Sequence, residues 1–210
     1  MRHTTRLPGF LVLAFALVGL PGLAHAQYKA PLFPGQAPPT QNFSAPDRTF
    51  SLNVPMNWVP KTFPDQPDFV EFRIEGPGDA WLQVRRLKVP NGARPRQVLA
   101  RAVEYRLKKL PHYTELRRRD INMGGANGAS VLATFWYQGN AEYPRAFEEI
   151  YLINGTEAFE FHFECFELAA AQISGALDRV YQSFVPHPPA PSEQSPNPDE
   201  DEDPLDKIPF

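Results

Sequence analysis

Residues 146–165 read AFEEIYLINGTEAFEFHFEC, and this stretch decides the fold. Two runs of alternating side chains flank Asn154-Gly155, a dipeptide that favours the tight turn of a β-hairpin because both residues tolerate a positive φ. We therefore predict strands over 146–153 and 158–165, joined at this turn. One face of the second strand carries four apolar side chains: Phe159, Phe161, Phe163 and Cys165. Alternation at this spacing predicts that this face is buried in a core.

The other face of the same hairpin is polar. Side chains spaced by two residues in a strand share a face and lie about 6.6 Å apart; here they are Glu160, His162 and Glu164. The first strand adds Glu149, opposite Glu160 or His162 depending on the register of the turn. One imidazole and two or three carboxylates can hold Zn²⁺ or Mn²⁺, so all four are candidate metal ligands. Alternatively, Arg145 on the same face pairs with Glu164, and the acidic face needs no metal.

Alternation and turn residues predict further strands in the rest of the chain, at 50–54, 69–75, 81–89, 113–123 and 129–138. Helical spacing of apolar residues predicts one helix from Pro95 to Leu110 and another from about Glu167 to Phe184. The segment 124–128, GGANG, is the tightest turn. Trp58 lies between two prolines, which predicts a loop, and a tryptophan in a loop can line a ligand cleft.

The order of these elements is three strands, a helix, four strands and a helix. Strands and helices do not alternate throughout, so we expect an α+β fold with a mainly antiparallel sheet. The strand over 129–138 is apolar on both faces, which predicts a central strand covered on both sides. The two helices can supply that cover.

Residues 50–58, FSLNVPMNW, resemble the opening of PsbP-like domains, in which a strand beginning Phe-Ser runs to a proline and then a tryptophan. The glycine-rich turn before 129–138, the turn at Asn154-Gly155 and the final helix ending at Phe184 fit the same family. The resemblance spans about residues 43–186. Its motifs are residues that determine the fold, and none of them is a catalytic signature.

This resemblance implies an α-β-α sandwich with a central, mainly antiparallel β-sheet flanked by helices, the Mog/PsbP-like architecture. The family includes the extrinsic PsbP subunit of photosystem II and bacterial relatives, and a Ran-binding relative shares the fold. It implies a binding or assembly module without enzymatic activity, for which a photosynthetic complex is one partner among several. Fold similarity alone does not transfer function.

The two ends of the chain differ from the domain between them. Residues 1–26 combine two arginines, the apolar run GFLVLAFALVGL and Ala24-His25-Ala26, which is the pattern of a signal peptide cleaved near Ala26. An uncleaved N-terminal anchor is the alternative. Residues 27–46 are rich in proline and read as a linker. The domain then covers 47–186. Residues 187–210 combine prolines with an acidic run, and we expect a disordered tail.

Composition excludes several functions. A single cysteine leaves no intrachain disulfide and no multi-cysteine zinc or iron–sulfur site. Cys165 and His162 lie three residues apart on a strand and so point to opposite faces, which predicts a buried structural thiol rather than a nucleophile. No P-loop, Rossmann or nucleophile-elbow motif is present. We therefore expect no enzyme, no cofactor apart from the metal considered above, and no transmembrane segment in the mature chain.

Charge is unevenly distributed along the chain. The segment 85–119 holds twelve bases and only two acids, whereas 120–178 holds nine acids and Arg145 as its single base. Such a domain can dock on a charged partner, and we predict partner-binding residues in the basic segment: Arg85, Arg86, Lys88, Arg117, Arg118 and Arg119. Alternatively, the two blocks neutralise each other across the fold. The acidic tail either reaches a partner or folds back over the basic face.

These observations predict an exported module that docks on a protein or membrane complex. The alternative is a periplasmic protein that binds a small ligand or a divalent metal. Nucleic acid is disfavoured as a partner because the chain carries a signal peptide and its pI is about 6.0. We expect the protein to be periplasmic, secreted or lumenal.

Overall fold

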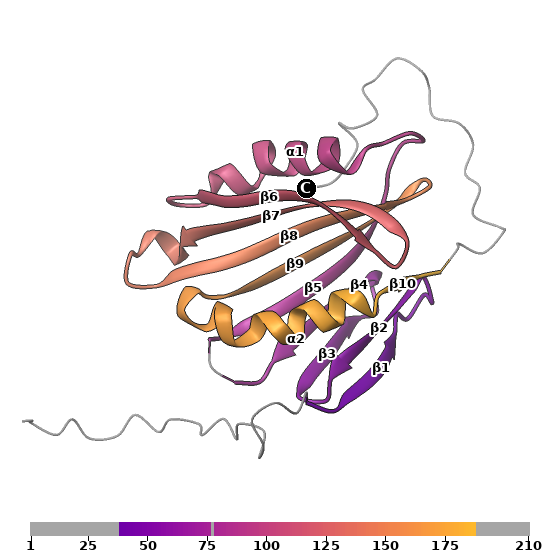
Figure 1. Cartoon of the computed structure of the whole chain (residues 1–210), viewed down its shortest axis with the longest axis horizontal. Coiled ribbons are helices and arrows are strands. Elements are labelled where there is room, and N and C mark those ends of the chain that lie inside the picture. The colour runs from indigo at the N-terminus through magenta and orange to yellow at the C-terminus, as the bar shows by residue number, and fades with distance from the viewer. Residues whose placement is uncertain (1–37, 77, 188–210) are drawn as a thin grey trace, which may run out of the picture.

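The computed structural model describes residues 38–76 and 78–187, which form two antiparallel sheets and two helices (Figure 1). The larger sheet has seven strands in the order β3-β4-β5-β9-β8-β7-β6, and the smaller has the order β1-β2-β10. The strands of the larger sheet are β3 (Trp58–Phe63), β4 (Gln66–Ile74), β5 (Ala80–Lys88), β6 (Thr114–Met123), β7 (Ala126–Trp136), β8 (Pro144–Asn154) and β9 (Glu157–Phe166). The smaller sheet consists of β1 (Thr40–Ser44), β2 (Phe50–Pro55) and β10 (Val185–Pro186).

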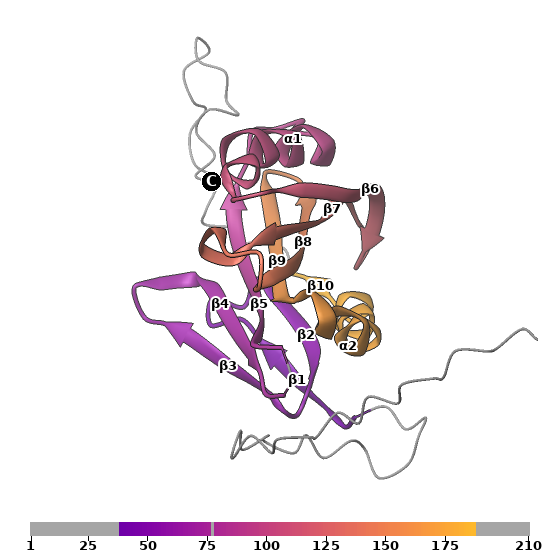
Figure 2. The same ribbon diagram turned by 90° about the vertical axis from the view of Figure 1, so that its left-hand side faces the viewer.

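The helices lie on opposite faces of the seven-stranded sheet (Figure 2). Helix α1 (Pro95–Tyr105) begins with its proline in the first turn, where the missing N–H costs no hydrogen bond, and is followed by the short helix η1 (Leu107–Lys109). Helix α2 (Ala170–Gln182) follows η3 (Glu167–Ala169) directly after β9. A further short helix, η2 (Tyr137–Gly139), connects β7 to β8. The predicted α-β-α sandwich with a mainly antiparallel sheet is confirmed.

Each face of the large sheet has its own apolar core. The larger core lies under α2 and the small sheet, where Phe159, Phe161 and Phe184 pack edge to face with ring centroids 5.0–5.2 Å apart. The smaller core lies under α1, which buries Val98, Leu99, Ala102 and Val103 against β7 and β8. The alternation in the central hairpin therefore divides its side chains between two different cores.

The central hairpin forms as predicted, with Gly155 at φ 68° in its turn. The register pairs Glu149 with His162, which is one of the two registers left open by the sequence. Cys165 is fully buried in the larger core, as predicted. Among the described residues, neither helix is long and apolar enough to cross a membrane.

Three expectations are corrected. Part of the expected linker forms β1, because residues 40–44 pair with β2 along their whole length. Trp58 begins β3 and is 2% exposed in the larger core, so it lines no ligand cleft. The strand predicted to be central, 129–138, is β7, second from the edge, and the middle strand is β9. Leu132 on this strand stays partly exposed, so the strand is not fully covered on both faces.

The β6–β7 turn supplies a test of the packing. Gly124 and Gly125 both adopt positive φ, at 55° and 79°. A Cβ on Gly124 would lie 2.4 Å from the carbonyl oxygen of Phe184, whereas a Cβ on Gly125 would meet no atom within 4 Å. We expect Gly125→Ala to lower the free energy of unfolding by about 1–2 kcal/mol through backbone strain alone. Gly124→Ala should lower the free energy of unfolding by about 1–3 kcal/mol more than Gly125→Ala does, because its new methyl group is forced against the Phe184 carbonyl. Urea unfolding of both variants measures the difference, and equal losses would contradict the contact.

Candidate functional site

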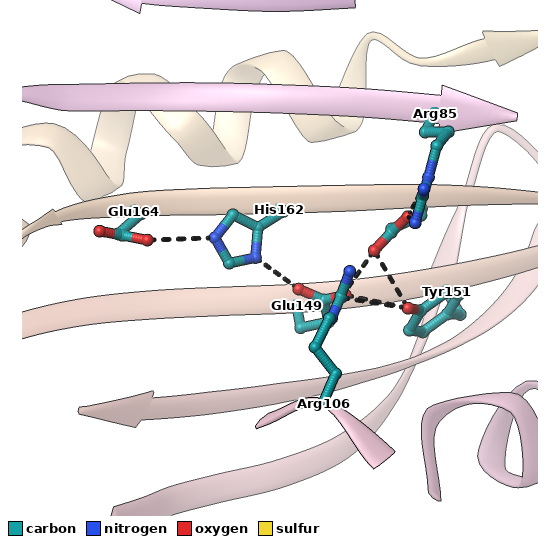
Figure 3. Close-up of polar contacts among 7 residues, drawn as sticks. Arg85, Arg106, Glu149, Tyr151, His162 and Glu164 are labelled. Atoms are coloured by element: carbon teal, nitrogen blue, oxygen red, sulfur yellow. Dashed lines mark hydrogen bonds and ion pairs between the residues drawn. The ribbon is translucent and has the colours of Figure 1, made fainter. Parts of the chain in front are cut away.

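The polar face of the central hairpin forms a layer of charged side chains on the same side of the sheet as α1. Strands β8 and β9 contribute the carboxylates and His162, β5 contributes Arg85, and the end of α1 contributes Arg106 (Figure 3). Glu149 is fully buried, and Glu160 is 3% exposed. Buried carboxylates persist only when they are paired and hydrogen-bonded, so the layer depends on these cations.

Arg106 joins the two buried carboxylates. Its Nη2 contacts Oε1 of Glu149 and lies 2.7 Å from Oε1 of Glu160. On the other side, Arg85 donates to Oε2 of Glu160 from Nε at 2.7 Å. The hydroxyl of Tyr151 lies 3.0 Å from Glu149 Oε1 and 3.1 Å from Glu160 Oε1, and it accepts from Arg106 at 3.3 Å. The result is a closed network of four side chains around one guanidinium.

His162 extends this network along β9. Its Nδ1 lies 2.5 Å from Oε2 of Glu149, and its Nε2 lies 3.3 Å from Oε2 of Glu164. Burial lowers the pKa of His162, but the two carboxylates outweigh burial and raise the pKa to about 9. At neutral pH the ring is therefore a cation with both nitrogens donating.

The pKa of Glu160 moves in the opposite direction. Burial raises the pKa of this carboxyl, but the charge of Arg106, a hydrogen bond with Glu149 and the charge of Arg85 lower it to about 2. Burial and the nearby charge of Glu160 raise the pKa of Glu149, against the opposing effect of His162 and Arg106. Glu149 and His162 are close enough to titrate as one unit.

Arg145 closes the other end of the layer. It is 1% exposed, its Nε pairs with Glu164, and its Nη2 donates to the carbonyl oxygen of Asp79 at 2.6 Å. The guanidinium also stacks over Trp81 at 4.4 Å and Phe166 at 4.8 Å. The sequence offered the Arg145–Glu164 pair as the alternative to a metal, and this pair forms.

The four candidate metal ligands thus lie together on one face, but arginine side chains occupy their oxygens. Within residues 38–76 and 78–187, no group of three or more histidine, cysteine, aspartate or glutamate side chains converges in a way that could hold a metal ion. Ligands spread along a strand do not meet at one point, and here guanidinium groups lie between Glu149 and Glu160. The described residues form an ion-pair network, and the metal site stays a prediction from the sequence.

The six predicted partner-binding residues do not form one patch. Arg85, Arg86 and Lys88 lie on β5, while 117–119 lie on β6, and three strands separate the two groups. Arg86 pairs with Glu157 at 2.9 Å and with Asp47 at 3.2 Å. The basic and acidic blocks therefore neutralise each other along β5, as the alternative interpretation held.

Positive charge remains in excess at the opposite edge. We name the basic edge by its residues on α1, η1 and β6: Arg94, Arg96, Arg101, Lys108, Lys109, Arg117, Arg118 and Arg119. Helix α1 lies beside the edge strand β6 (Figure 1), and a 2.5 Å pair between Arg96 and Asp120 joins them. Three more acids pair with cations of this edge: Glu104 with Lys108, Glu115 with Arg118, and Glu148 with Arg119. Three exposed cations of the edge make no ion pair with any described residue: Arg94, Lys109 and Arg117.

Sequence reasoning missed Arg106 and Tyr151. A signal for Arg106 was present, since it follows Leu99 by seven residues and so falls on the apolar stripe that faces the sheet. A cation on that stripe needs a buried anion. Tyr151 alternates with Glu149 on β8 and so shares its face. The partners could not be assigned without the register between strands.

The network offers no evident nucleophile. Cys165 faces the opposite core, and burial raises the pKa of its thiol to about 11. Burial likewise raises the pKa of the Tyr151 hydroxyl well above its ordinary value. Every carboxylate of the layer is engaged by a cation. Chemically, the layer orders charge beneath α1.

The His162 pairing predicts a pH dependence. Folding raises the pKa of His162 from 6.5 to about 9. The contribution of the protonated ring to the free energy of unfolding is therefore complete below pH 6.5 and is lost as the pH rises through 9. We expect the free energy of unfolding to fall by up to roughly 3 kcal/mol over that interval. His162→Asn should remove this slope. His112→Asn is the matched control, since His112 is exposed and stacks only on Trp136. A flat profile in the parent chain from urea unfolding would contradict the pairing.

No protein-family model matches the chain, and no curated protein matches its sequence. Solved structures match its fold. Cyanobacterial PsbP from Synechocystis aligns with a TM-score of 0.54 and 15% identity over 76% of this chain and 99% of that one. LpqN of Mycobacterium tuberculosis, described as involved in cell envelope biogenesis, aligns with a TM-score of 0.53 and 13% identity over 71% and 86%.

The Ran-binding protein Mog1p of Saccharomyces cerevisiae aligns with a TM-score of 0.52 and 8% identity over 70% of this chain and 95% of that one. Identities this low concern the fold alone. The three proteins share the arrangement described above, a mainly antiparallel sheet between helices. The chain therefore has the Mog/PsbP fold, as the resemblance of residues 50–58 implied.

Proposed function

We propose that this chain is an exported, non-enzymatic binding module that docks on an acidic surface of a protein or membrane complex through its basic edge. The observation that carries the proposal is the charge of that edge, where three exposed cations make no ion pair with a described residue: Arg94 and Lys109 beside α1, and Arg117 on the other side of the edge strand. Along β5, by contrast, Arg85 and Arg86 pair with Glu160 and Glu157 of the neighbouring strand. Unpaired surface cations steer an anionic partner and fix its orientation.

The absence of enzymatic activity is part of this proposal. The most buried ionisable cluster is held in ion pairs, and it contains no serine, threonine or cysteine side chain that could act as a nucleophile. The solved structures with this fold include a Ran-binding protein and PsbP, which supports a role in binding. Export is supported by the signal-peptide pattern of residues 1–26, which lie outside the described residues.

A pull-down from the native envelope tests the proposal. The tagged bait is the chain from Gln27 to Phe210, compared with a variant that carries Arg94→Glu, Lys109→Glu and Arg117→Glu. We expect the parent chain to retain a defined complex and the variant to lose it, because charge reversal replaces attraction with repulsion. Retention by the parent should weaken steeply with added salt, as screening predicts.

Three exposed cations away from the basic edge supply the matched control: Arg48, Lys61 and Arg179. Reversing these three changes the net charge by the same amount and should leave the complex intact. Equal loss with both triple variants would show an effect of net charge only, and equal retention by both would exclude the basic edge. Either result overturns the proposed docking surface.

The acidic tail, 187–210, supplies a second test. The tail contains seven acids and one lysine, and all of it except His187 lies outside the described residues. We propose that it competes with the partner for the basic edge. A chain ending at Pro186 should then bind an anionic resin more tightly than the full chain does. Truncation also removes negative charge, so the comparison is repeated in both triple variants.

If the tail covers the basic edge, truncation should tighten resin binding strongly in the parent and in the control triple variant, and weakly in the basic-edge variant. The measurement is the salt concentration at which each chain elutes. An equal shift in all three backgrounds would show a simple change in net charge. If truncation leaves the resin binding of the parent chain unchanged, the proposal that the tail covers the basic edge is also wrong.

A further inference from the structure

An open pocket of about 370 Å³ lies at the end of the large sheet where β8 begins and β9 ends. Its apolar wall is formed by Tyr143, Pro144, Phe166 and Leu168. Leu168 is 91% exposed and Tyr143 is half exposed. A leucine and a tyrosine exposed to this extent around one hollow form an apolar patch, and such patches mark surfaces that another segment covers.

The rim of the pocket is acidic. Glu142 and Glu167 line it, both are exposed, and neither forms an ion pair with a described residue. No lysine or arginine is among the residues that line the pocket. Arg145 is nearby but is held by Glu164 and Asp79. The occupant that fits is therefore an apolar segment that carries a positive charge.

The N-terminal end of the described chain lies close to this pocket. The carbonyl oxygen of Pro39 accepts a hydrogen bond of 2.9 Å from the backbone N–H of Met56. The next residue, Asn57, donates from its side chain to the carbonyl oxygen of Glu75 at 3.3 Å. The chain thus enters β1 beside the connection between β4 and β5.

That same connection forms one wall of the pocket. Gly78, three residues after Glu75, accepts a 2.9 Å hydrogen bond from the N–H of Phe166. Gly78 also packs against Ala169, whose Cβ would lie 2.3 Å from a Cβ on the glycine. Two hydrogen bonds and a short connection therefore link the start of β1 to the pocket.

The segment that precedes β1 has the chemistry of the expected occupant. Residues 28–33 read YKAPLF, which combines Lys29 with Leu32 and Phe33. An extended chain spans about 3.3–3.6 Å per residue. Phe33 lies five residues before Pro38, where the described domain begins, and can therefore lie up to roughly 17 Å from it. This length allows Phe33 to approach the wall of the pocket formed by the β4–β5 connection.

A second segment of similar composition is less well placed. Residues 207–210 read KIPF, and the chain leading to them leaves the domain at His187. The N–H of His187 donates to the carbonyl oxygen of Thr49 at 2.7 Å, beyond the C-terminal end of α2. The pocket is at the N-terminal end of α2, about 20 Å away along a 13-residue helix. Proximity favours the N-terminal segment.

We propose that residues 28–33 of this chain bind back onto the domain, with Leu32 and Phe33 in the pocket and Lys29 beside Glu142 and Glu167. The proline between Ala30 and Leu32 favours an extended backbone, which suits a segment that lies along a surface. This contact is separate from the basic edge, and it fixes the direction in which the chain leaves the domain toward residue 27.

Amide chemical shifts of the chain from Gln27 to Phe210 test the proposal. The double variant Leu32→Ser/Phe33→Ser should shift the backbone amide resonances of Tyr143, Phe166 and Leu168, since the apolar contact would be lost. Lys29→Glu should shift the resonances of Glu142 and Glu167, and Lys29→Arg should leave them unchanged. The matched control is Ile208→Ser/Phe210→Ser, which makes the same kind of change in the C-terminal segment and should leave the pocket resonances in place.

Three results would overturn the proposal. Shifts at the pocket with the C-terminal variant alone would assign the pocket to residues 207–210. Pocket resonances that move on dilution of the parent chain, and do not respond to Leu32→Ser/Phe33→Ser, would assign it to a second copy. Pocket resonances that respond to none of the variants and not to dilution would show that no segment of the chain covers it.

Discussion

The guanidinium of Arg106 between Glu149 and Glu160 is the interaction on which the rest of the structure depends. Strands β8 and β9 present apolar side chains to the larger core and carboxylates toward α1. The carboxylates are buried because α1 and the neighbouring strands leave them little contact with water. Without a cation from α1 they would repel each other inside the sheet, and removing one partner of a buried ion pair costs about 3–5 kcal/mol. The position of α1 on the sheet is thus fixed by charge as well as by packing.

This constraint also explains how charge is distributed over the surface. Arginines at 85, 106 and 145 are used within the fold, and so is the protonated ring of His162. The acidic second half of the chain is largely neutralised by the basic first half, mainly where β5 meets β9 and where α1 ends. Three exposed cations without an ion pair to a described residue lie around α1 and the edge strand β6: Arg94, Lys109 and Arg117. These charges are separate from the charges that stabilise the core.

Much of the fold could be predicted from the sequence, because local chemistry settles it. The turn at Asn154-Gly155, the alternation on either side of it and the apolar spacing of both helices follow from preferences of single segments. The errors came where pairing between distant segments decides the outcome. Residues 40–44 look like a linker, but β2 offers them a free edge, and Trp58 reads as a loop until β4 is placed beside it.

The candidate site divides in the same way. Alternation alone places Glu149, Glu160, His162 and Glu164 on one face, and the structure confirms that grouping. The sequence pattern could not show that arginines from β5 and the end of α1 lie over these side chains, because those contacts join residues that are 43 to 75 positions apart. Similarly, the sequence suggested that the basic segment forms one surface. The order of strands, which separates β5 from β6, cannot be predicted from the residues of either strand alone.

The burial of the single thiol makes the folded chain chemically different from the unfolded chain. Cys165 is fully enclosed by the larger core, and its raised pKa keeps it protonated at neutral pH. A folded molecule therefore presents no thiolate to an oxidant or to another protein's disulfide. A molecule that has not yet folded leaves this side chain exposed to both. A disulfide between two copies of this chain would therefore indicate that at least one of them had not folded. The time for which Cys165 stays reactive depends on how fast the central hairpin forms.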